Sequence, residues 1–289
     1  MADGPLHRVR DSVGGAEVVD RLSQLSGSDF TTLMLEVARR RAARETPASV
    51  LRRYRTDRFS QPGRISYRKL LRAETLIVDH LPDDTKLVTL APVVPLATHS
   101  ALDTVSQNKV VTAMRACEVA ADPTNALALE AALRRQHDRD QVAKLAGIQR
   151  VLRAQRFPAP YQAHFSLFGM VTGGRDIGDR RFDIGALNEH LKLAVSVLRD
   201  AGAGDIDVAL TPLSPTGELI SDAITVPTRI DADRQSGYYE DLCFKIDADG
   251  LEVGDGGFTD WTRRLTSNHK ERLLISCLGV DRLAVILGS

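Results

Sequence analysis

The 289-residue sequence lacks the features that would place it in a membrane or outside the cell. No apolar run approaches the roughly 20 residues that a membrane-spanning helix needs, so we expect no membrane partner. The N-terminus, Met-Ala-Asp-Gly-Pro, has no basic segment followed by an apolar one, which is the order of a secretory signal. We therefore expect a cytoplasmic protein.

Cysteine is also scarce, and neither sign of charge is in excess. The three cysteines, Cys117, Cys243 and Cys277, are odd in number and scattered, so they provide neither a disulfide framework nor the spacing of a metal site. Basic residues (Lys and Arg) and acidic residues (Asp and Glu) both number 38, so no overall field draws the chain to nucleic acid. Binding to nucleic acid would need a local basic patch.

What the sequence does contain is the composition of an ordinary globular protein, with 43% hydrophobic and 26% charged residues. Apolar spacing and strong helix formers predict helices over residues 66–80, 126–135, 183–200 and 261–265. We predict strands over 86–92, 149–155, 163–172 and 205–213, a β-rich stretch over 109–121, and a hairpin of 237–246 with 251–256 through Asp249-Gly250. This pattern is typical of an α+β fold, an antiparallel sheet flanked by helices, rather than of a regular βαβ alternation.

Residues 1–62 are predicted to form a helical extension that is rich in arginine. Ser28-Asp29 is a candidate N-cap for one helix, and Thr46-Pro47 for the next. Gln61-Pro62-Gly63 breaks the chain, so we expect the core to span residues 63–289. The arginines gather at the end of one helix and along the next: Arg39, Arg40, Arg41, Arg44, Arg52, Arg53, Arg55 and Arg58. Two interpretations stay open: a solvated face balanced by acids elsewhere, or a site for the phosphates of RNA or another polyanion.

The closing stretch, Ser276 to Leu287, combines a glycine, an acid and an arginine with an apolar run. Gly279-x-Asp281-Arg282 is able to open a helix whose apolar side packs inward while Arg282 points into a cleft. The same pattern also fits a helix start with an ordinary surface ion pair. It gains functional meaning only if other anion-binding arginines lie upstream.

The segment from Val151 to Gly174 supplies one such arginine, Arg153, in a strand-loop-strand unit. This segment resembles motif 2 of the class II aminoacyl-tRNA synthetases, and the pattern of histidyl-tRNA synthetase is the most similar. Gly279 to Arg282 resembles motif 3 of the same class. The strand that ends at Pro92 lies where motif 1 and its proline belong.

Three shorter segments between these motifs resemble histidyl-tRNA synthetase as well. Arg234-Gln-Ser-Gly-Tyr238-Tyr239 is similar to its Arg-Gly-Leu-Asp-Tyr-Tyr, and Gly256-Gly-Phe-Thr-Asp260 is similar to its Gly-Gly-Arg-Tyr-Asp. Asp122-Pro-Thr124 falls where that family has Glu-x-Thr. The chain thus resembles the class II synthetase catalytic core, and also a relative of histidyl-tRNA synthetase, the regulatory subunit of ATP phosphoribosyltransferase.

The resemblance implies a site for an amino acid and for ATP with its Mg²⁺. The motif 2 arginine, which maps to Arg153, holds the α-phosphate and the substrate carboxylate. Arg234 maps to an arginine that assists at the α-phosphate, and Arg282 to one that holds the γ-phosphate; fixed guanidinium groups suit this work because they stay charged and rigid. The implied catalytic residues are Arg153 and Arg234, the ATP-binding residues are Arg153, Gln155, Arg156 and Arg282, and the amino-acid-binding residues are Asp122, Thr124, Leu167, Val171, Tyr238 and Tyr239.

The departures from the family pattern bear on the substrate. Gln155 replaces the motif 2 glutamate, and Tyr161 replaces the arginine of the motif 2 loop. The glutamine and glutamate that recognise histidine fall on Leu167 and Val171, so we expect a smaller or more hydrophobic side chain than that of histidine. Tyr238 and Tyr239 fit either the wall of that pocket or the core.

Two functions remain open on this basis. The first is a stand-alone ligase that activates an amino acid as an acyl-adenylate and passes it to an acceptor other than a standard cognate tRNA. The second is a non-catalytic regulatory or binding protein, akin to the regulatory subunit named above. The sequence ends soon after Arg282, so we expect no anticodon-binding domain. Both functions predict a homodimer, since motif 1 forms a two-fold interface in this family.

Overall fold

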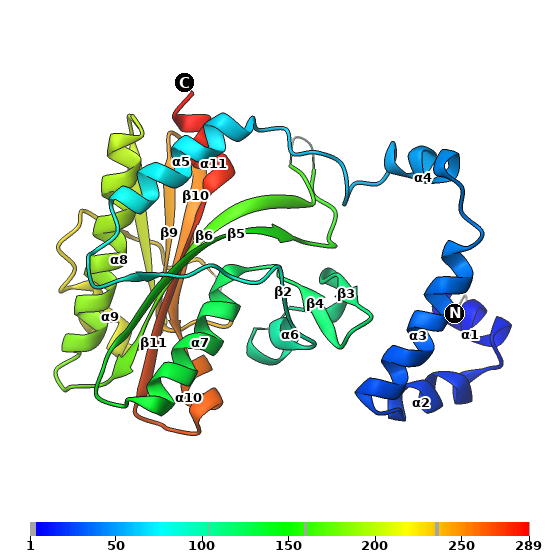
Figure 1. Ribbon diagram of the computed structural model, residues 1–289. Helices are drawn as coiled ribbons and strands as arrows, with labels where there is room; N and C mark the ends of the chain where they lie inside the picture. Colours follow the sequence, from blue (N-terminus) through cyan, green and yellow to red (C-terminus); the bar gives the residue numbers. More distant parts are fainter. Residues whose placement is uncertain (1–3, 104, 159–160, 235–236, 289) are drawn as a thin grey trace.

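A large sheet organises the computed structural model, which describes residues 4–103, 105–158, 161–234 and 237–288 (Figure 1). Its strands lie in the order β1 (Lys86–Leu87), β5 (Ala143–Leu152), β6 (His164–Arg175), β11 (Glu271–Gly279), β10 (Leu251–Thr259), β9 (Glu240–Ala248), β7 (Ile206–Pro212) and β8 (Arg229–Ile230). The five inner pairings are antiparallel, and only the outer pairs β1–β5 and β7–β8 are parallel. The prediction of an α+β fold with an antiparallel sheet flanked by helices is confirmed, and the two parallel outer pairs are the departure from it.

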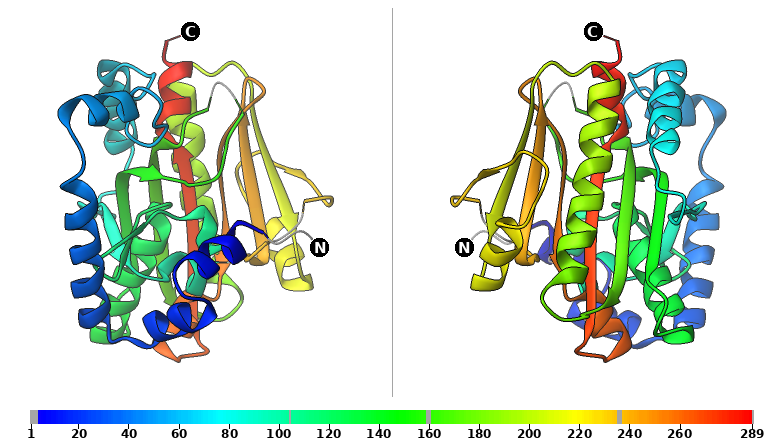
Figure 2. Two further views of the ribbon diagram at one scale, coloured as in Figure 1. Left: turned by 90° about the vertical axis from the view of Figure 1, so that its right-hand side faces the viewer. Right: turned by 90° about the vertical axis from the view of Figure 1, so that its left-hand side faces the viewer.

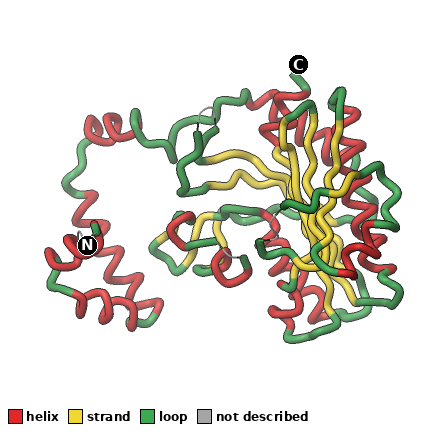
Figure 3. Tube along the Cα trace, turned by 180° about the vertical axis from the view of Figure 1, so that it is seen from behind, coloured by secondary structure: helices red, strands yellow, loops and turns green. Residues whose placement is uncertain are grey.

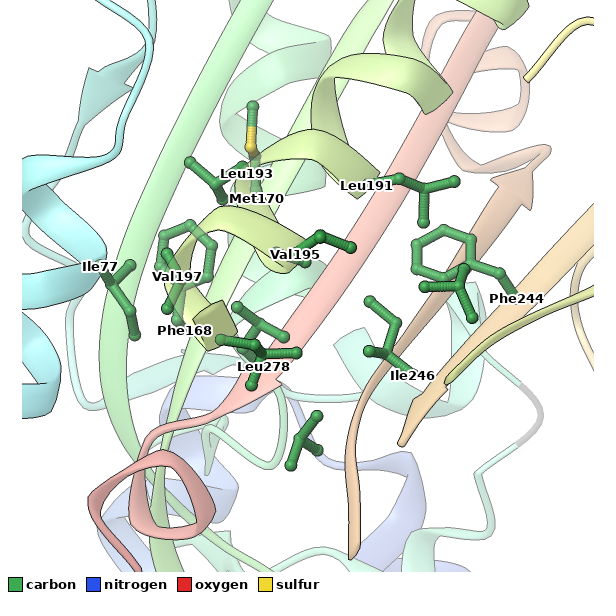
Figure 4. Packing of buried hydrophobic residues seen from close by; sticks show 14 of the residues in the cluster. Ile77, Phe168, Met170, Leu191, Leu193, Val195, Val197, Phe244, Ile246 and Leu278 are labelled. Atoms are coloured by element: carbon green, nitrogen blue, oxygen red, sulfur yellow. The ribbon is translucent and has the colours of Figure 1, made fainter. Parts of the chain in front are cut away.

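Helices cover both faces of this sheet. On one face, α5 (Tyr67–Asp79), α8 (Arg181–Asp200), α9 (Pro215–Ser221) and α11 (Val280–Ile286) contribute to one large apolar cluster. Figure 4 shows Phe168 and Met170 of β6 meeting Val195 and Val197 of α8 there, and Figure 2 shows α8 running along β11. On the other face, α7 (Pro123–His137) and α10 (Trp261–Thr266) cover a smaller cluster. We call this second face the α7 face.

A small three-stranded sheet precedes α7. It consists of β2 (Val93–Pro95), β4 (Cys117–Val119) and β3 (Thr112–Ala113), with α6 (Thr98–Leu102) and the 3₁₀ turn Gln107–Lys109 beside it. The Glu118 side chain is fully buried and accepts hydrogen bonds from the backbone N–H groups of Ala97 and His99. The carboxylate therefore fixes the start of α6 against β4.

Residues 4–62 form an arm of four helices: α1 (Pro5–Ser12), α2 (Ala16–Gln24), α3 (Gly27–Ala42) and α4 (Pro47–Tyr54). None of these helices buries a residue. Figures 1 and 3 show the arm standing away from the large sheet. It touches the small sheet where the Thr31 hydroxyl donates to the Met114 carbonyl. We refer to these residues as the N-terminal arm.

Local predictions hold best where one signal decides the structure. Thr46 caps α4 through a capping box with Ser49, as its position before proline predicts. The Asp249-Gly250 turn joins β9 to β10 with positive φ angles of 51° and 77°, the conformation that the predicted hairpin requires. The cap of α3, however, is Ser26 and not Ser28, because the Ser26 hydroxyl accepts the Asp29 N–H at 3.1 Å.

The predicted boundaries of helices and strands differ from the observed ones where contacts with other elements set them. The strand expected over 149–155 begins at Ala143 and ends at Leu152, because β5 pairs along its length with β6. Of the strand expected over 86–92, only Lys86–Leu87 pairs. The helix expected from Ala126 begins at Pro123, since Asp122 caps it. Among the described helices, none has the length and apolar composition needed to cross a bilayer.

Candidate functional site

The α7 face of the sheet carries a row of side chains from three adjacent strands. Cys277 on β11 pairs with Gly169 on β6 and with Asp255 on β10. Leu167 stands two residues before Gly169 and so shares its face. Residues paired directly across a sheet point to the same side. Leu167, Cys277 and Asp255 therefore form one floor.

The N-terminus of α7 lies directly on this floor. A Cβ atom at Gly169 would come within 2.8 Å of the Pro123 side chain, so only glycine allows this approach. Asp122 caps the helix: its Oδ1 accepts the Thr124 N–H at 2.9 Å and the Thr124 hydroxyl at 2.7 Å. Arg153, just past the end of β5, donates to Asp122 Oδ2 at 3.2 Å and to the Ala121 carbonyl at 2.9 Å.

A buried polar network holds Asp122 from behind. The Ala121 N–H donates to His99 Nε2 at 3.0 Å, which leaves Nδ1 to donate to Asn125 Oδ1 at 2.8 Å. His99 and Asn125 are each only 1% exposed. Both residues flanking the Asp122–Thr124 segment are thus fixed, and we expect the position of the Asp122 carboxylate to be well defined.

A second arginine–carboxylate pair lies on the far side of Cys277. The Arg234 guanidinium donates to the Phe244 carbonyl at 2.5 Å and to Asp255 Oδ2 at 3.1 Å. The Tyr239 hydroxyl also donates to Asp255 Oδ2, at 3.3 Å, and receives a hydrogen bond of the same length from the Tyr238 hydroxyl. Tyr238 stacks on Trp261 of α10 with 5.3 Å between ring centroids. The two pairs, Arg153–Asp122 and Arg234–Asp255, therefore face one another across the floor.

The protonation of the site follows from burial. Burial, with the negative charges of Asp122 and Asp255, raises the pKa values of the Tyr238 phenol and the Cys277 thiol well above their usual ranges. Burial also raises the pKa of the Asp255 carboxyl, while Arg234 opposes the rise. The Asp255 side chain is 41% exposed, so water limits that rise. At neutral pH the phenols and the thiol are neutral donors between two ion pairs.

Arg282 lies on α11, at the end of the sheet that also holds Arg153. Gly279 is the N-cap of α11, and Val280, Leu283 and Ala284 are buried beneath it, as predicted for the closing stretch. Arg282 donates to the Glu252 carbonyl and lies 3.6 Å from the Glu252 carboxylate. Its guanidinium also lies over the Tyr161 ring, 5.7 Å from the centroid. Tyr161 is the residue that replaces the loop arginine of motif 2.

The remaining implied residues lie in different surroundings. Gln155 and Arg156 lie in the loop after β5, where the Gln155 carbonyl accepts from Arg58 of the arm at 2.9 Å and Arg156 is exposed. Leu167 is 8% exposed on the floor. Val171 is completely buried in the apolar cluster beneath α7 and lines no open surface. Of the two apolar replacements, Leu167 is therefore the one placed to meet a ligand.

Asp255 and Cys277 are site residues that the motif comparison does not identify. Asp255 stands directly before the Gly256-Gly257 pair, and strand alternation alone puts its side chain on the same face as Gly257. Gly257 in turn leaves room for the Tyr239 ring, which a Cβ atom there would approach to 2.6 Å.

In the described part of the chain, no three His, Cys, Asp or Glu residues group as a metal site.

Comparison with solved structures shows which fold this is. The chain aligns with an ATP phosphoribosyltransferase regulatory subunit/histidyl-tRNA synthetase from Bacillus halodurans at a TM-score of 0.63 and 12% identity, covering 80% of this chain and 83% of that one. Histidyl-tRNA synthetase from S. aureus aligns at 0.57 and 15% identity, covering 77% and 65%. Pyrrolysyl-tRNA synthetase from Desulfitobacterium hafniense aligns at 0.53 and 13%, covering 82% and 73%.

These neighbours share the class II synthetase-like fold, and the chain has that fold. No protein-family model matches the sequence, and no curated protein matches it. At 12–15% identity the likeness concerns the fold alone.

Proposed function

We propose that the chain binds an amino acid and ATP on the α7 face and joins them as an acyl-adenylate. The observation that carries this proposal is the convergence of Arg153 and Arg234 on one floor, with Arg282 at the end of the same sheet. Each guanidinium is anchored through a backbone carbonyl, so its position is fixed before any ligand arrives. Preorganised positive charge is what stabilises a reacting phosphate.

In the proposed reaction, a carboxylate oxygen of the amino acid attacks the α-phosphorus of ATP, and pyrophosphate leaves. Arg153 and Arg234 offset the negative charge that develops at the α-phosphate, and Arg282 holds the γ-phosphate. Mg²⁺ would be held mainly by the ATP phosphates and water, since this ion needs few protein ligands in nucleotide sites. The acyl group then passes to an acceptor other than a standard cognate tRNA. The apolar side chain of Leu167 favours a substrate other than histidine.

A second candidate is a non-catalytic protein that binds an amino acid. One observation favours it: each of the three arginines already has a carboxylate beside it, Asp122, Asp255 and Glu252 respectively. The site is therefore charge-balanced without ATP. A zwitterionic ligand adds no net charge to such a site, whereas a triphosphate must compete with the three carboxylates.

Amino-acid-dependent exchange of labelled pyrophosphate into ATP, measured across a panel of amino acids, tests the ligase. We expect exchange with at least one amino acid, and we expect Arg282→Ala to weaken ATP binding by roughly 1.5–3 kcal/mol, the value of a charge-assisted hydrogen bond. Arg229→Ala is the matched control, because Arg229 pairs with Asp207 at the β8 edge, outside the site. Its ATP affinity should equal that of the wild type.

The two candidates give different results in this experiment. If no amino acid supports exchange and calorimetry detects no ATP binding, the ligase proposal is wrong. Amino-acid binding in the absence of ATP binding would then establish the second candidate. Both candidates include a homodimer, which the resemblance to motif 1 implies. Light scattering tests it by measuring the mass of the protein in solution.

A further inference from the structure

The two carboxylates of the site differ in how many of their acceptor positions are in use. Asp122 Oδ1 accepts from the backbone and hydroxyl of Thr124 and lies 3.5 Å from the Cys277 sulfur, while Oδ2 faces Arg153. The Asp122 side chain is 22% exposed. A carboxylate that caps a helix and pairs with an arginine has little capacity left for a further cation.

Asp255 is more open. Its Oδ2 accepts from Arg234 and Tyr239, but no donor within the described residues reaches Oδ1. Its side chain is 41% exposed, about twice the fraction at Asp122. Among the described residues, the Asp255 carboxylate therefore keeps one oxygen available to a ligand on the floor of the site.

The surroundings of Asp255 suit a primary ammonium group. The rings of Tyr238 and Tyr239 lie 4.5 Å apart between centroids, and the Tyr239 ring already lies 5.8 Å from the Arg234 guanidinium carbon. Aromatic faces attract cations through their quadrupole. The carboxylate supplies charge, and the rings supply a wall that shields the ammonium from water.

We propose that Asp255, and not Asp122, binds the ammonium group of the substrate, while Asp122 positions α7 and Arg153. The inference rests on the proposed function only in taking the ligand to be an amino acid. An ammonium on Oδ1 leaves the Oδ2–Arg234 bond intact. Because one carbon separates the ammonium and carboxylate groups of an α-amino acid, the two groups can lie against adjacent members of the Arg234–Asp255 pair.

The test compares ligands that differ only in the ammonium group, such as alanine with propionate and leucine with 4-methylpentanoate. Calorimetry measures their binding to the wild type, Asp255→Asn and Asp122→Asn. We expect Asp255→Asn to weaken amino-acid binding about 10–100-fold and to leave the deaminated ligands unchanged. Asp122→Asn keeps a capping side-chain oxygen and removes the ion pair with Arg153, so it should change Tm only slightly and should retain the preference for amino acids over deaminated ligands.

Asp207→Asn, which disrupts an ion pair with Arg229 outside the site, is the matched control. Asp255→Ser provides a second, smaller substitution if the asparagine variant unfolds. Full amino-acid affinity in the Asp255 variants, or loss of the ammonium preference in Asp122→Asn alone, would overturn the inference. So would a wild type that binds none of the amino acids in the panel.

The inference and the ligase can fail separately. If amino-acid binding depends on Asp255 but no pyrophosphate exchange occurs, the ligase proposal is wrong and the inference about Asp255 stands. If Asp255→Asn still catalyses pyrophosphate exchange with the wild-type KM for the amino acid, the ligase proposal stands and the inference about Asp255 is wrong.

Discussion

The N-terminal arm and α8 of the core obtain their helical structure in opposite ways. In the arm, α4 has a capping box at Thr46 and Ser49, yet it buries no residue. In the core, the N-cap of α8 is Arg180, with a positive φ of 55° and no capping side chain. That helix buries eleven residues. Local signals dominate in the arm, and tertiary burial dominates in the core.

This difference has an energetic consequence. Helices of 8–16 residues are marginal in water when they rest on propensity and caps alone. Burial of apolar surface contributes far more than a cap, at about 25 cal/mol per Å². We expect the core to set the stability of the chain and the arm to depend on whatever covers its exposed apolar side chains, such as Leu33 and Leu51.

Ion pairs show the same contrast and provide the largest predicted effect. Arg135 on α7 and Glu271 on β11 form a two-point pair in which both side chains are 1% exposed. Glu271→Ala should lower the free energy of unfolding by about 3–5 kcal/mol, because it leaves a buried guanidinium without its partner. Urea unfolding monitored by circular dichroism measures the change.

The arm offers the control for this variant. Glu36 pairs with Arg39 and Arg40 at the surface of α3, where both arginine side chains are about three-quarters exposed. Glu36→Ala should change the free energy of unfolding by less than about 1 kcal/mol. If the two variants lose equal stability, the arm shares the cooperative unit of the core and the comparison is wrong.

The second prediction uses pH to separate the regions. His190 on α8 is 1% exposed and lies between the Thr172 and Ser276 hydroxyls, at 2.9 and 2.8 Å. Burial, with a smaller contribution from Lys144, lowers the pKa of His190 to about 3. The unfolded chain takes up this proton near pH 6.5 and the folded chain does not, so stability falls as pH falls through this window.

Relative to His190→Gln, the wild type should lose roughly 2–3 kcal/mol of unfolding free energy between pH 8 and pH 4.5. The difference between the two proteins removes the shared contribution of other groups. His7→Gln, in the exposed helix α1, is the control for replacing a histidine in the arm. If the unfolding free energies of the wild type and His190→Gln change in parallel with pH, His190 takes up a proton in the folded protein and the prediction is wrong.

The same contrast explains how far the sequence predicts the fold. The cap at Thr46 and the Asp249-Gly250 turn were predictable because each signal lies within a few residues. The extent of β5 was not, because its partner β6 determines it. β11 was not predicted either, because it is buried on both faces and lacks the alternation of a half-buried strand.

The residues of the candidate site show the same difference between local signals and distant contacts. Motif resemblance points to Arg153, Arg234 and Arg282, because each lies in its own short stretch of sequence that resembles a motif. It did not identify their carboxylate neighbours Asp255 and Glu252, because strand register places those beside the arginines. For the same reason, the motif named Asp122 as a ligand group without revealing that the helix cap and Arg153 occupy its oxygens.

The smallest predicted effect concerns what the arm binds. Arg39, Arg40 and Arg53 are paired with acids, as the solvated interpretation requires. In the described residues no acid forms an ion pair with Arg41, Arg44, Arg52 or Arg55, and Glu45, which pairs with Arg53, acts on Arg52 only from a greater distance. These four arginines therefore remain available to an outside partner, for which we propose the phosphates of RNA. Arg52→Ala should reduce the slope of log K against log salt by about 1, the contribution of one phosphate contact.

Arg40→Ala is the matched control, because Glu36 already neutralises Arg40. Its salt slope, measured by filter binding to a mixed tRNA pool, should stay close to that of the wild type. Equal slopes for the two variants would mean that pairing within the arm does not decide which arginines meet phosphate. A wild type with no salt-sensitive retention would show that the arm carries a solvated arginine surface. Its exposed apolar side chains would then be the feature left to explain, and a protein partner would replace RNA as the expected occupant.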